Sequence, residues 1–185
     1  MSREALIVVD VQQAFDDPRM GPRNNPACDG NIAALIEDFR RRGEPVVVVR
    51  HDSVEDGSVL RPGEPGNALK DYVAAVEPDL LVTKNVNSAF IGEPDLDGWL
   101  RARGIDRIAI CGIQTNHCCE TTARMGANMG YEVDFVIDAT HTFDRTGPDG
   151  ETFDADTLSR VTAANLHEEF ATVVTTAAIL EAPAR

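Results

Sequence analysis

The sequence predicts an α/β fold, a single domain over residues 1–185 with three α/β/α layers around a six-stranded, mostly parallel sheet. Two observations lead to this prediction. Short apolar runs rich in β-branched residues alternate along the chain with longer segments whose apolar residues recur at helical spacing. The apolar runs are also continuous, which is typical of strands that are buried on both faces because helices cover both sides of a parallel sheet.

Six runs have the length and composition of buried strands. They are residues 5–10 (ALIVVD), 45–50 (PVVVVR), 80–84 (LLVTK), 107–111 (RIAIC), 132–138 (EVDFVID) and 171–176 (ATVVTT). The strand at 80–84 is short and ends in a lysine, and the first strand is closed by an aspartate. Strands at these positions leave room for helices in most of the intervals between them.

Helices are expected at 31–42, 96–103, about 116–129 and 156–167. The first ends before Gly43, a residue suited to the left-handed conformation of a helix C-cap. The third can be capped at its start by Thr115 or Asn116. Residues 51–66 instead combine charges with glycines and prolines, which predicts a long functional loop.

Charge and cysteine usage limit the class of protein. With 17 basic and 31 acidic residues the formal net charge is −14, which argues against nucleic acid and anionic membranes as partners, because phosphates attract basic surfaces. A cationic substrate is compatible with this charge, although acidic surfaces also serve solubility alone. No apolar segment approaches the ~18 residues of a membrane span, and the N-terminus does not resemble a signal peptide. We therefore expect a cytoplasmic protein whose cysteines 28, 111, 118 and 119 remain thiols.

Chemically useful side chains follow three of the predicted strands. Asp10 closes the first strand, Lys84 the third, and the turn 112–119 with its two cysteines comes after the fourth. Ligands bind beyond the carboxyl ends of strands in open parallel sheets. A carboxylate, an ammonium group and a thiol are thus expected at one edge of one sheet.

Three segments resemble the motifs of the isochorismatase-like cysteine hydrolases. The segment CGIQTNHCCETTARMGANMGYEV (111–133) is similar to the nucleophile segment of that superfamily, VVDVQQAF to its Asp-x-Gln-x-x-Phe start, and LVTKNVNSAF to its lysine motif. The matching residues are Asp10, Gln12, Phe15, Lys84, Ser88, Ala89, Phe90, Gly112, Ile113, Gln114, Thr115, Cys118, Thr122 and Ala123. The motifs occur in family order over nearly the whole chain, and the resemblance is to the branch of N-carbamoylsarcosine amidase and streptothricin hydrolase. It implies an isochorismatase-like, Rossmann-like fold.

The resemblance also implies a catalytic triad of Asp10, Lys84 and Cys118. Cys118 would be the nucleophile, and its position near a helix N-terminus and the charge of Lys84 favour the thiolate and predict a pKa below the usual ~8.5 of a free thiol. Asp10 would accept the thiol proton and return it to the leaving group. A cis peptide bond between Ile113 and Gln114 and an oxyanion hole made by the backbone N–H groups of Gln114 and Cys118 are implied as well.

Residues around this triad are expected to contact the substrate. They are Phe15, Phe90, Asn116, His117, Thr142 and Phe143. For Phe15 and Phe90 core packing is the alternative. His117 is adjacent to Cys118, but neighbours on a helix point about 100° apart, so we expect a pocket or interface residue rather than a partner of the thiol.

No metal or other cofactor is expected. The loop after the second strand carries His51 and Asp52 but no second histidine, and two ligands are too few for a stable zinc site. Nicotinamidases, a branch of the family that the sequence resembles, carry a metal site built from an aspartate and histidines in this loop. The missing second histidine therefore disfavours a metal-dependent nicotinamidase. No Gly-x-Gly-x-x-Gly follows a strand, so dinucleotide binding has no support.

The leading functional hypothesis is a cysteine hydrolase that cleaves the C–N bond of a small amide, carbamoyl compound or lactam through a thioester. One alternative is an isochorismatase that cleaves a vinyl ether by protonation from Asp10, against which the presence of Cys118 counts. The other is a non-catalytic binding or redox module. The expected partner is a small-molecule substrate, and the resemblance implies a homo-oligomer, either a dimer or a tetramer.

Overall fold

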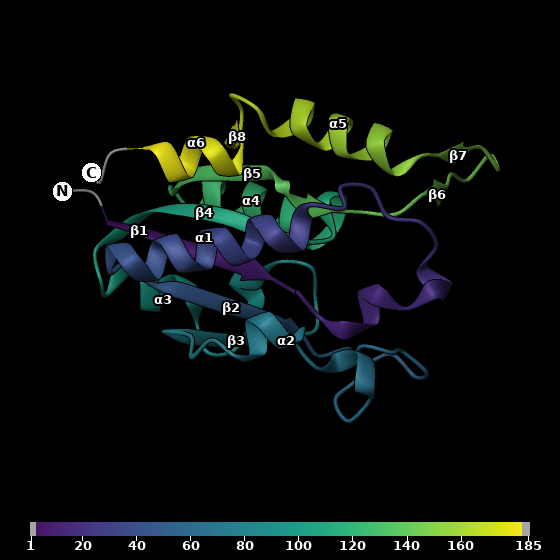
Figure 1. The fold of residues 1–185 in the computed structure, drawn as a ribbon, viewed down its shortest axis with the longest axis horizontal. Helices are drawn as coiled ribbons and strands as arrows, with labels where there is room; N and C mark the ends of the chain where they lie inside the picture. Colours follow the sequence, from purple (N-terminus) through teal and green to yellow (C-terminus); the bar gives the residue numbers. More distant parts are fainter. Residues whose placement is uncertain (1–2, 183–185) are drawn as a thin grey trace.

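The computed structural model describes residues 3–182, and its centre is a six-stranded sheet in which every neighbouring pair of strands is parallel (Figure 1). The spatial order is β3-β2-β1-β4-β5-β8. The strands are β1 (Arg3–Val9), β2 (Val46–His51), β3 (Leu80–Lys84), β4 (Ile105–Ile113), β5 (Glu132–His141) and β8 (Thr172–Val174). The predicted fold class and all six predicted strands are confirmed.

Helices cover both faces of the sheet. They are α1 (Cys28–Arg42), α2 (Asp71–Ala74), α3 (Leu96–Arg101), α4 (Glu120–Asn128), α5 (Ala155–Leu166) and α6 (Thr176–Glu181). Alternate residues of β1 point to opposite faces: Leu6 belongs to a core cluster with residues of α1 and α6, and Ile7 to a cluster with residues of α3, α4 and α5 (Figure 1). Two separate apolar cores therefore sandwich the sheet.

The boundaries differ from the sequence prediction where local pattern is ambiguous. Helix α1 begins at Cys28, three residues earlier than predicted, and β5 continues to His141. The last strand stops at Val174 because the Thr175 hydroxyl caps α6, which was not predicted. The short helix α2 and the hairpin of β6 (Arg145–Thr146) and β7 (Thr152–Phe153) were also not predicted.

The predicted end of α1 at Gly43 is confirmed. Gly43 has a φ of 71°, and its N–H donates to the carbonyls of Arg40 and Phe39. A residue without a Cβ adopts this left-handed conformation without steric cost. None of the helices in residues 3–182 combines the length and apolar character needed to cross a bilayer.

The strand order reverses between β1 and β4. From β1 the chain adds β2 and β3 on one side, and β4, β5 and β8 lie on the other. Gly112, near the end of β4, has a φ of 129°, and a Cβ at this position would lie only 2.0 Å from the Val9 carbonyl oxygen. Because such a reversal opens a crevice at the carboxyl ends of the strands, a ligand site is expected beyond β1 and β4.

Candidate active site

Asp10 is the first residue after β1, at the point where the strand order reverses. Its φ of 51° is in the left-handed region, which aspartate tolerates better than most residues. The backbone N–H of Asp10 donates to the Val49 carbonyl at 2.9 Å, and the residue is 1% exposed. The end of β1 therefore turns a carboxylate into a buried position between β2 and β4.

Lys84 is the last residue of β3, and its side chain reaches across β2 to Asp10. Its Nζ lies 2.6 Å from Asp10 Oδ2, and both side chains are buried. The same Nζ is 3.2 Å from Nδ1 of His51, the residue paired with Lys84 in the strand register. Burial opposes the charge on Lys84, but the Asp10 carboxylate and Cys118 outweigh it, so the pKa of Lys84 is raised.

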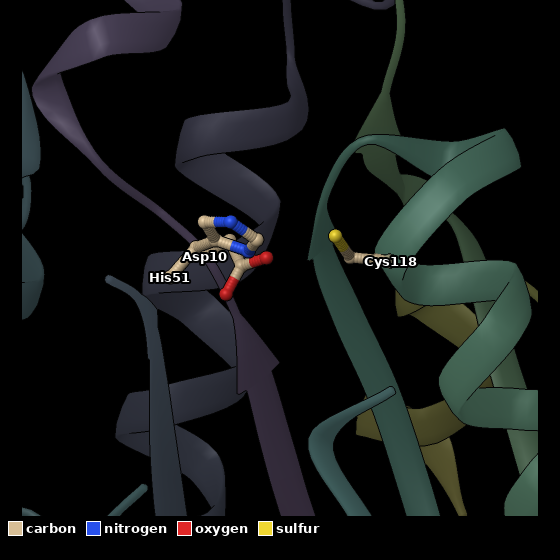
Figure 2. A group of neighbouring side chains, drawn as sticks. All are labelled: Asp10, His51 and Cys118. Atoms are coloured by element: carbon tan, nitrogen blue, oxygen red, sulfur yellow. The ribbon is translucent and has the colours of Figure 1, made fainter. Parts of the chain in front are cut away.

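Cys118 lies in a helical turn, Thr115–Cys119, that has π-helical geometry and continues into α4. The turn follows β4 directly, and the peptide bond between Ile113 and Gln114 is cis, as the resemblance implies. Cys118 is 9% exposed, and the thiol lies 3.7 Å from Asn87 Oδ1. Figure 2 shows its sulfur pointing toward Asp10 and His51; donor atoms of the three residues lie within 4.8 Å of one another. The structure thus brings together all three residues of the predicted triad.

The protonation state of Cys118 differs from the sequence expectation of an easily ionised thiol. The pKa of Cys118 is raised to about 12, mainly by burial and additionally by the Asp10 carboxylate, whereas Lys84 lowers it. Loss of solvation and the nearby negative charge together outweigh the lysine. The resting group is therefore a thiol, and forming the thiolate requires a base that accepts its proton.

His51 is a site residue that the sequence reasoning placed in a loop. It is the last residue of β2, and its backbone is held by Gln12, whose side chain accepts from His51 N at 2.9 Å and donates to His51 O at 3.0 Å. Burial and then Lys84 lower the pKa of His51, so the ring is neutral and accepts from Lys84 at Nδ1. Extending the predicted strand by one residue would have placed His51 at the same sheet edge as Asp10.

Asn87 is the second residue missed, and it is exposed beside the Cys118 thiol. Its loop is held against α4: the N–H of Ala89 donates to the Thr122 hydroxyl at 3.1 Å, and the Ser88 hydroxyl donates to the Met125 sulfur at 3.1 Å. The segment that follows Lys84 is thereby attached to α4, the helix that continues from the turn with Cys118. An asparagine in a polar loop carries no signal in the sequence that distinguishes it from its neighbours.

Two of the predicted substrate residues, Asn116 in the turn that carries Cys118 and Thr142 after β5, contact each other. The Thr142 hydroxyl donates to Asn116 Oδ1 at 2.6 Å and lies 3.4 Å from Gln114 Oε1. Thr142 is fully buried and follows the end of β5, whereas Asn116 is half-buried. This contact fixes the turn that carries Cys118 against the neighbouring strand.

The three remaining predicted aromatic contacts are buried in the two cores. Phe15 and Phe143 stack on each other with ring centroids 6.4 Å apart. Phe90 stacks on Tyr131 at 5.6 Å on the opposite face of the sheet, which supports the packing alternative for this residue.

His117, the residue before Cys118, is half-buried. Burial is the main cause that lowers the pKa of His117, and the charge of Arg145 is the second. Among the described residues it is not part of the group of donor atoms around Cys118. The other cysteines are buried free thiols, and Cys118 is the most exposed of the four.

The side chain of Asp52 does not join His51. The Asp52 carboxylate accepts from Arg50 at 2.7 and 2.9 Å and from Asn67 at 2.9 Å. Over residues 3–182 the group of three or more potential metal ligands is instead Asp10, His51 and Cys118. Asp52 is thus paired with Arg50 and does not form a metal-binding pair with His51.

The fold and site define an α/β protein with a carboxylate, an ammonium group and a thiol gathered where the strand order of its sheet reverses. The chain belongs to the isochorismatase family, whose isochorismatase domain model matches residues 4–178. An uncharacterized isochorismatase family protein of Bacillus subtilis is 38% identical over 94% of this chain and 92% of its own length. A solved structure of a cysteine hydrolase from Pseudomonas syringae is 30% identical, with a TM-score of 0.87 over 96% of this chain and 91% of that one.

Several relatives have names that state an activity. Nicotinamidase 3 of Arabidopsis thaliana is 33% identical over 75% of this chain and 73% of its own length. A ureidoacrylate amidohydrolase of Azorhizobium caulinodans is 31% identical over 78% of both chains. The structure of N-carbamoylsarcosine amidase from Thermoplasma acidophilum is 28% identical, with a TM-score of 0.69 over 94% of this chain and 96% of that one. This chain is therefore a member of a hydrolase family that includes amidohydrolases.

Proposed function

We propose that the protein is a cysteine-dependent hydrolase that cleaves a C–N bond of a small amide, carbamoyl compound or lactam. The observation that carries this proposal is the buried Lys84–Asp10 pair beside the Cys118 thiol, at the reversal of strand order. The amidase and amidohydrolase relatives support a C–N bond as the target. The thiol at position 118 supports nucleophilic attack over the protonation of a vinyl ether.

The first half-reaction begins with a proton transfer. Asp10 holds Lys84 through Oδ2, while its Oδ1 is buried without a hydrogen-bond partner in the described part of the chain and is therefore free to accept the Cys118 proton. The sulfur then bonds to the substrate carbonyl carbon, and Lys84 balances the negative charge that develops in the site. The backbone N–H groups of Gln114 and Cys118 stabilise the oxyanion. When the C–N bond breaks, Asp10 returns its proton to the departing nitrogen.

The second half-reaction hydrolyses the thioester. Asp10, again ionised, accepts a proton from water as the water oxygen bonds to the acyl carbon. The C–S bond then breaks, the acid or carbamate is released, and the proton passes back to Cys118. Asp10 acts in both directions, so one carboxylate serves both steps.

Substrate selection is assigned to the residues around the thiol. Asn116 and His117 are half-buried beside Cys118, and we expect them to contact the substrate, with Thr142 positioning Asn116. Phe15 and Phe143, which stack on each other in the core, remain candidates for an apolar contact with the substrate. The 51–66 loop, the 85–92 segment and the 140–148 loop complete the list of candidates.

We also propose that the enzyme works in the cytoplasm as a homo-oligomer. Four cysteines that all remain free thiols suit a reducing compartment. Val54, Val86 and Ile91, in the two loops near the site, are exposed apolar residues that a subunit interface would cover. Light scattering coupled to gel filtration tests this, and a monomeric mass at micromolar concentration would contradict it.

Release of ammonia or amine from a panel of amides, N-carbamoyl amino acids, ureido acids and lactams tests the hydrolase. Rapid-quench mass spectrometry of a turned-over substrate should show an acyl adduct on Cys118. The Cys118→Ala variant should lose both signals, and Cys28→Ala, which removes another buried thiol, should keep them. Turnover of isochorismate that survives Cys118→Ala would instead support the vinyl ether reaction.

A further inference from the structure

Three side chains of different donor chemistry converge at the candidate active site. Asp10 follows β1, His51 ends β2, and Cys118 lies in the turn after β4. A carboxylate oxygen, a ring nitrogen and the thiol sulfur all lie within 4.8 Å of one another, and Figure 2 shows the Cys118 sulfur pointing toward the other two side chains. Lys84 contacts Asp10 and His51. The proposed hydrolysis uses Asp10, Lys84 and Cys118 but gives the imidazole of His51 no role.

Thiolate, imidazole and carboxylate are the usual protein ligands of zinc, and three of them leave a fourth position for water. In a tetrahedral zinc centre the donor atoms lie about 3.3–3.7 Å apart, given metal–ligand distances of about 2.0–2.3 Å. The donor atoms here lie within 4.8 Å of one another, so they would have to move up to about 1 Å closer to bind one ion. The donor set therefore suits a zinc-type divalent cation.

Two further observations point to a ligand at this position. Asp10 Oδ1 is buried and has no hydrogen-bond partner in the described part of the chain. His51 is fixed through its backbone, because its carbonyl accepts from Gln12 at 3.0 Å and from Asn67 at 2.9 Å. One ligand atom is thus available, and another is held in place by residues outside the cluster.

Lys84 opposes a cation at this position. Its ammonium group lies 2.6 Å from Asp10 Oδ2 and 3.2 Å from His51 Nδ1, so the charge of Lys84 repels a metal ion. Asp10 can keep Lys84 on Oδ2 and still present Oδ1. Lys84 therefore sets how tightly a cation binds without removing the site.

We propose that Asp10, His51 and Cys118 form a binding site for a zinc-type divalent cation, and that binding of the cation occupies the thiol and blocks hydrolysis. As the metal–sulfur bond forms, the thiol loses its proton to solvent. The ion is an inhibitor of the proposed reaction and not a cofactor of it. Formation of the site requires only the three donors and does not depend on any substrate.

Cobalt(II) titration of the full chain tests this proposal without an enzyme assay. One equivalent of cobalt should produce the intense near-ultraviolet absorption of a thiolate-to-cobalt transition, and Cys118→Ser should abolish it. His51→Ala should weaken binding at least about tenfold, since even loss of outer partners of a ligand costs this much. Lys84→Met should bind more tightly than the unaltered protein, and a Lys84→Met/Cys118→Ser double variant should lose that gain.

His167→Ala is the matched control, because His167 is exposed and lies outside the group of Asp10, His51 and Cys118. The affinity of this variant for cobalt should equal that of the unaltered protein. The proposal is overturned if the absorption persists in Cys118→Ser, or if His51→Ala binds as tightly as the unaltered protein. It is also overturned if Lys84→Met binds no more tightly. A cobalt band in a protein without amidase activity would support the metal site and contradict the proposed hydrolase. Amidase activity without the band would support the hydrolase and contradict the metal site.

Discussion

Lys84 Nζ lies 2.6 Å from Asp10 Oδ2 in a buried position, while Asp10 Oδ1 has no hydrogen-bond partner among the described residues. The two oxygens of this carboxylate therefore have different roles. One binds the ammonium group and the other is free to exchange a proton with Cys118. This asymmetry determines how substitutions at the site should behave.

Substitution of Lys84 by methionine should destabilise the protein by about 3–5 kcal/mol, because it leaves a buried carboxylate without its counter-ion. The double variant Asp10→Asn/Lys84→Met should regain most of this stability, since neither side chain is then charged. Urea denaturation of the single and double variants measures the difference. A double variant as unstable as Lys84→Met would show that the ion pair does not account for the loss.

The same variants should separate stability from catalysis. Removal of the Asp10 carboxylate, the proposed base, or of its counter-ion Lys84 should lower kcat/KM at least about 100-fold, the usual contribution of general acid–base catalysis. The double variant should be stable yet remain inactive. Recovery of activity together with stability would contradict the role given to Asp10.

Alkylation of Cys118 by iodoacetamide should be slow at neutral pH and strongly pH-dependent. Burial raises the pKa of Cys118 to about 12, so the thiolate fraction, and with it the labelling rate, should rise about tenfold per pH unit from 7 to 9 without a plateau. Peptide mass spectrometry of the labelled protein follows the rate at this one residue. A labelling rate that reaches a plateau below pH 8.5 would mean that Lys84 lowers the pKa of Cys118 by more than burial raises it.

Two variants test the signs of the electrostatic effects on this thiol. The Asp10 carboxylate raises the pKa of Cys118 and Lys84 lowers it. Asp10→Asn should therefore label faster than the unaltered protein and Lys84→Met more slowly at the same pH. A change in the opposite direction in either variant would contradict the assignment.

The raised pKa of Cys118 also predicts how stability depends on pH. The thiol keeps its proton in the folded state above the pKa of about 9 that it has when unfolded, so the folded state holds more protons between pH 9 and about 12. Stability should therefore fall as pH rises through this window. Cys118→Ala should show a smaller fall in the free energy of unfolding between pH 8 and 10.

Asn87→Ala should impair the reaction while leaving the fold intact. Asn87 is exposed, and its Oδ1 lies 3.7 Å from the Cys118 sulfur, so its loss removes a polar contact of this thiol but little packing. We expect kcat/KM to fall about tenfold, equivalent to the ~1.4 kcal/mol scale of one hydrogen bond. Asn85→Ala, in the same exposed loop, is the control. Equal effects of the two substitutions would indicate a general effect of the loop.

Gly112→Ala should destabilise the protein by more than about 3 kcal/mol, because its Cβ would lie 2.0 Å from the Val9 carbonyl oxygen at a φ of 129°. Gly43→Ala is the matched control. Gly43 also has a positive φ, but a Cβ there would have no neighbour within 4 Å, so the cost is about 1–2 kcal/mol of backbone strain. Urea denaturation compares the two. Equal losses would mean that the close approach of β1 and β4 has no energetic consequence.

The strands and the main helices could be predicted because their signals are local. Six apolar runs gave six strands, and the spacing of apolar residues together with Gly43 located α1 and its end. The motif residues Asp10, Lys84 and Cys118 were identified from the resemblance and from their positions after predicted strands. The short elements α2, α6, β6 and β7 were missed because two to six residues carry too little periodic pattern.

The sequence by itself determined which segments form the six strands of the main sheet, and that a carboxylate, an ammonium group and a thiol follow three of them. The order of the strands, which no single segment encodes, decided that β2 lies between β1 and β3 and so brings His51 to Lys84 and Asp10. Tertiary structure also decided that the thiol stays protonated. The pKa of Cys118 depends on its burial and on charges from residues far apart in the sequence, so a local sequence pattern cannot predict it.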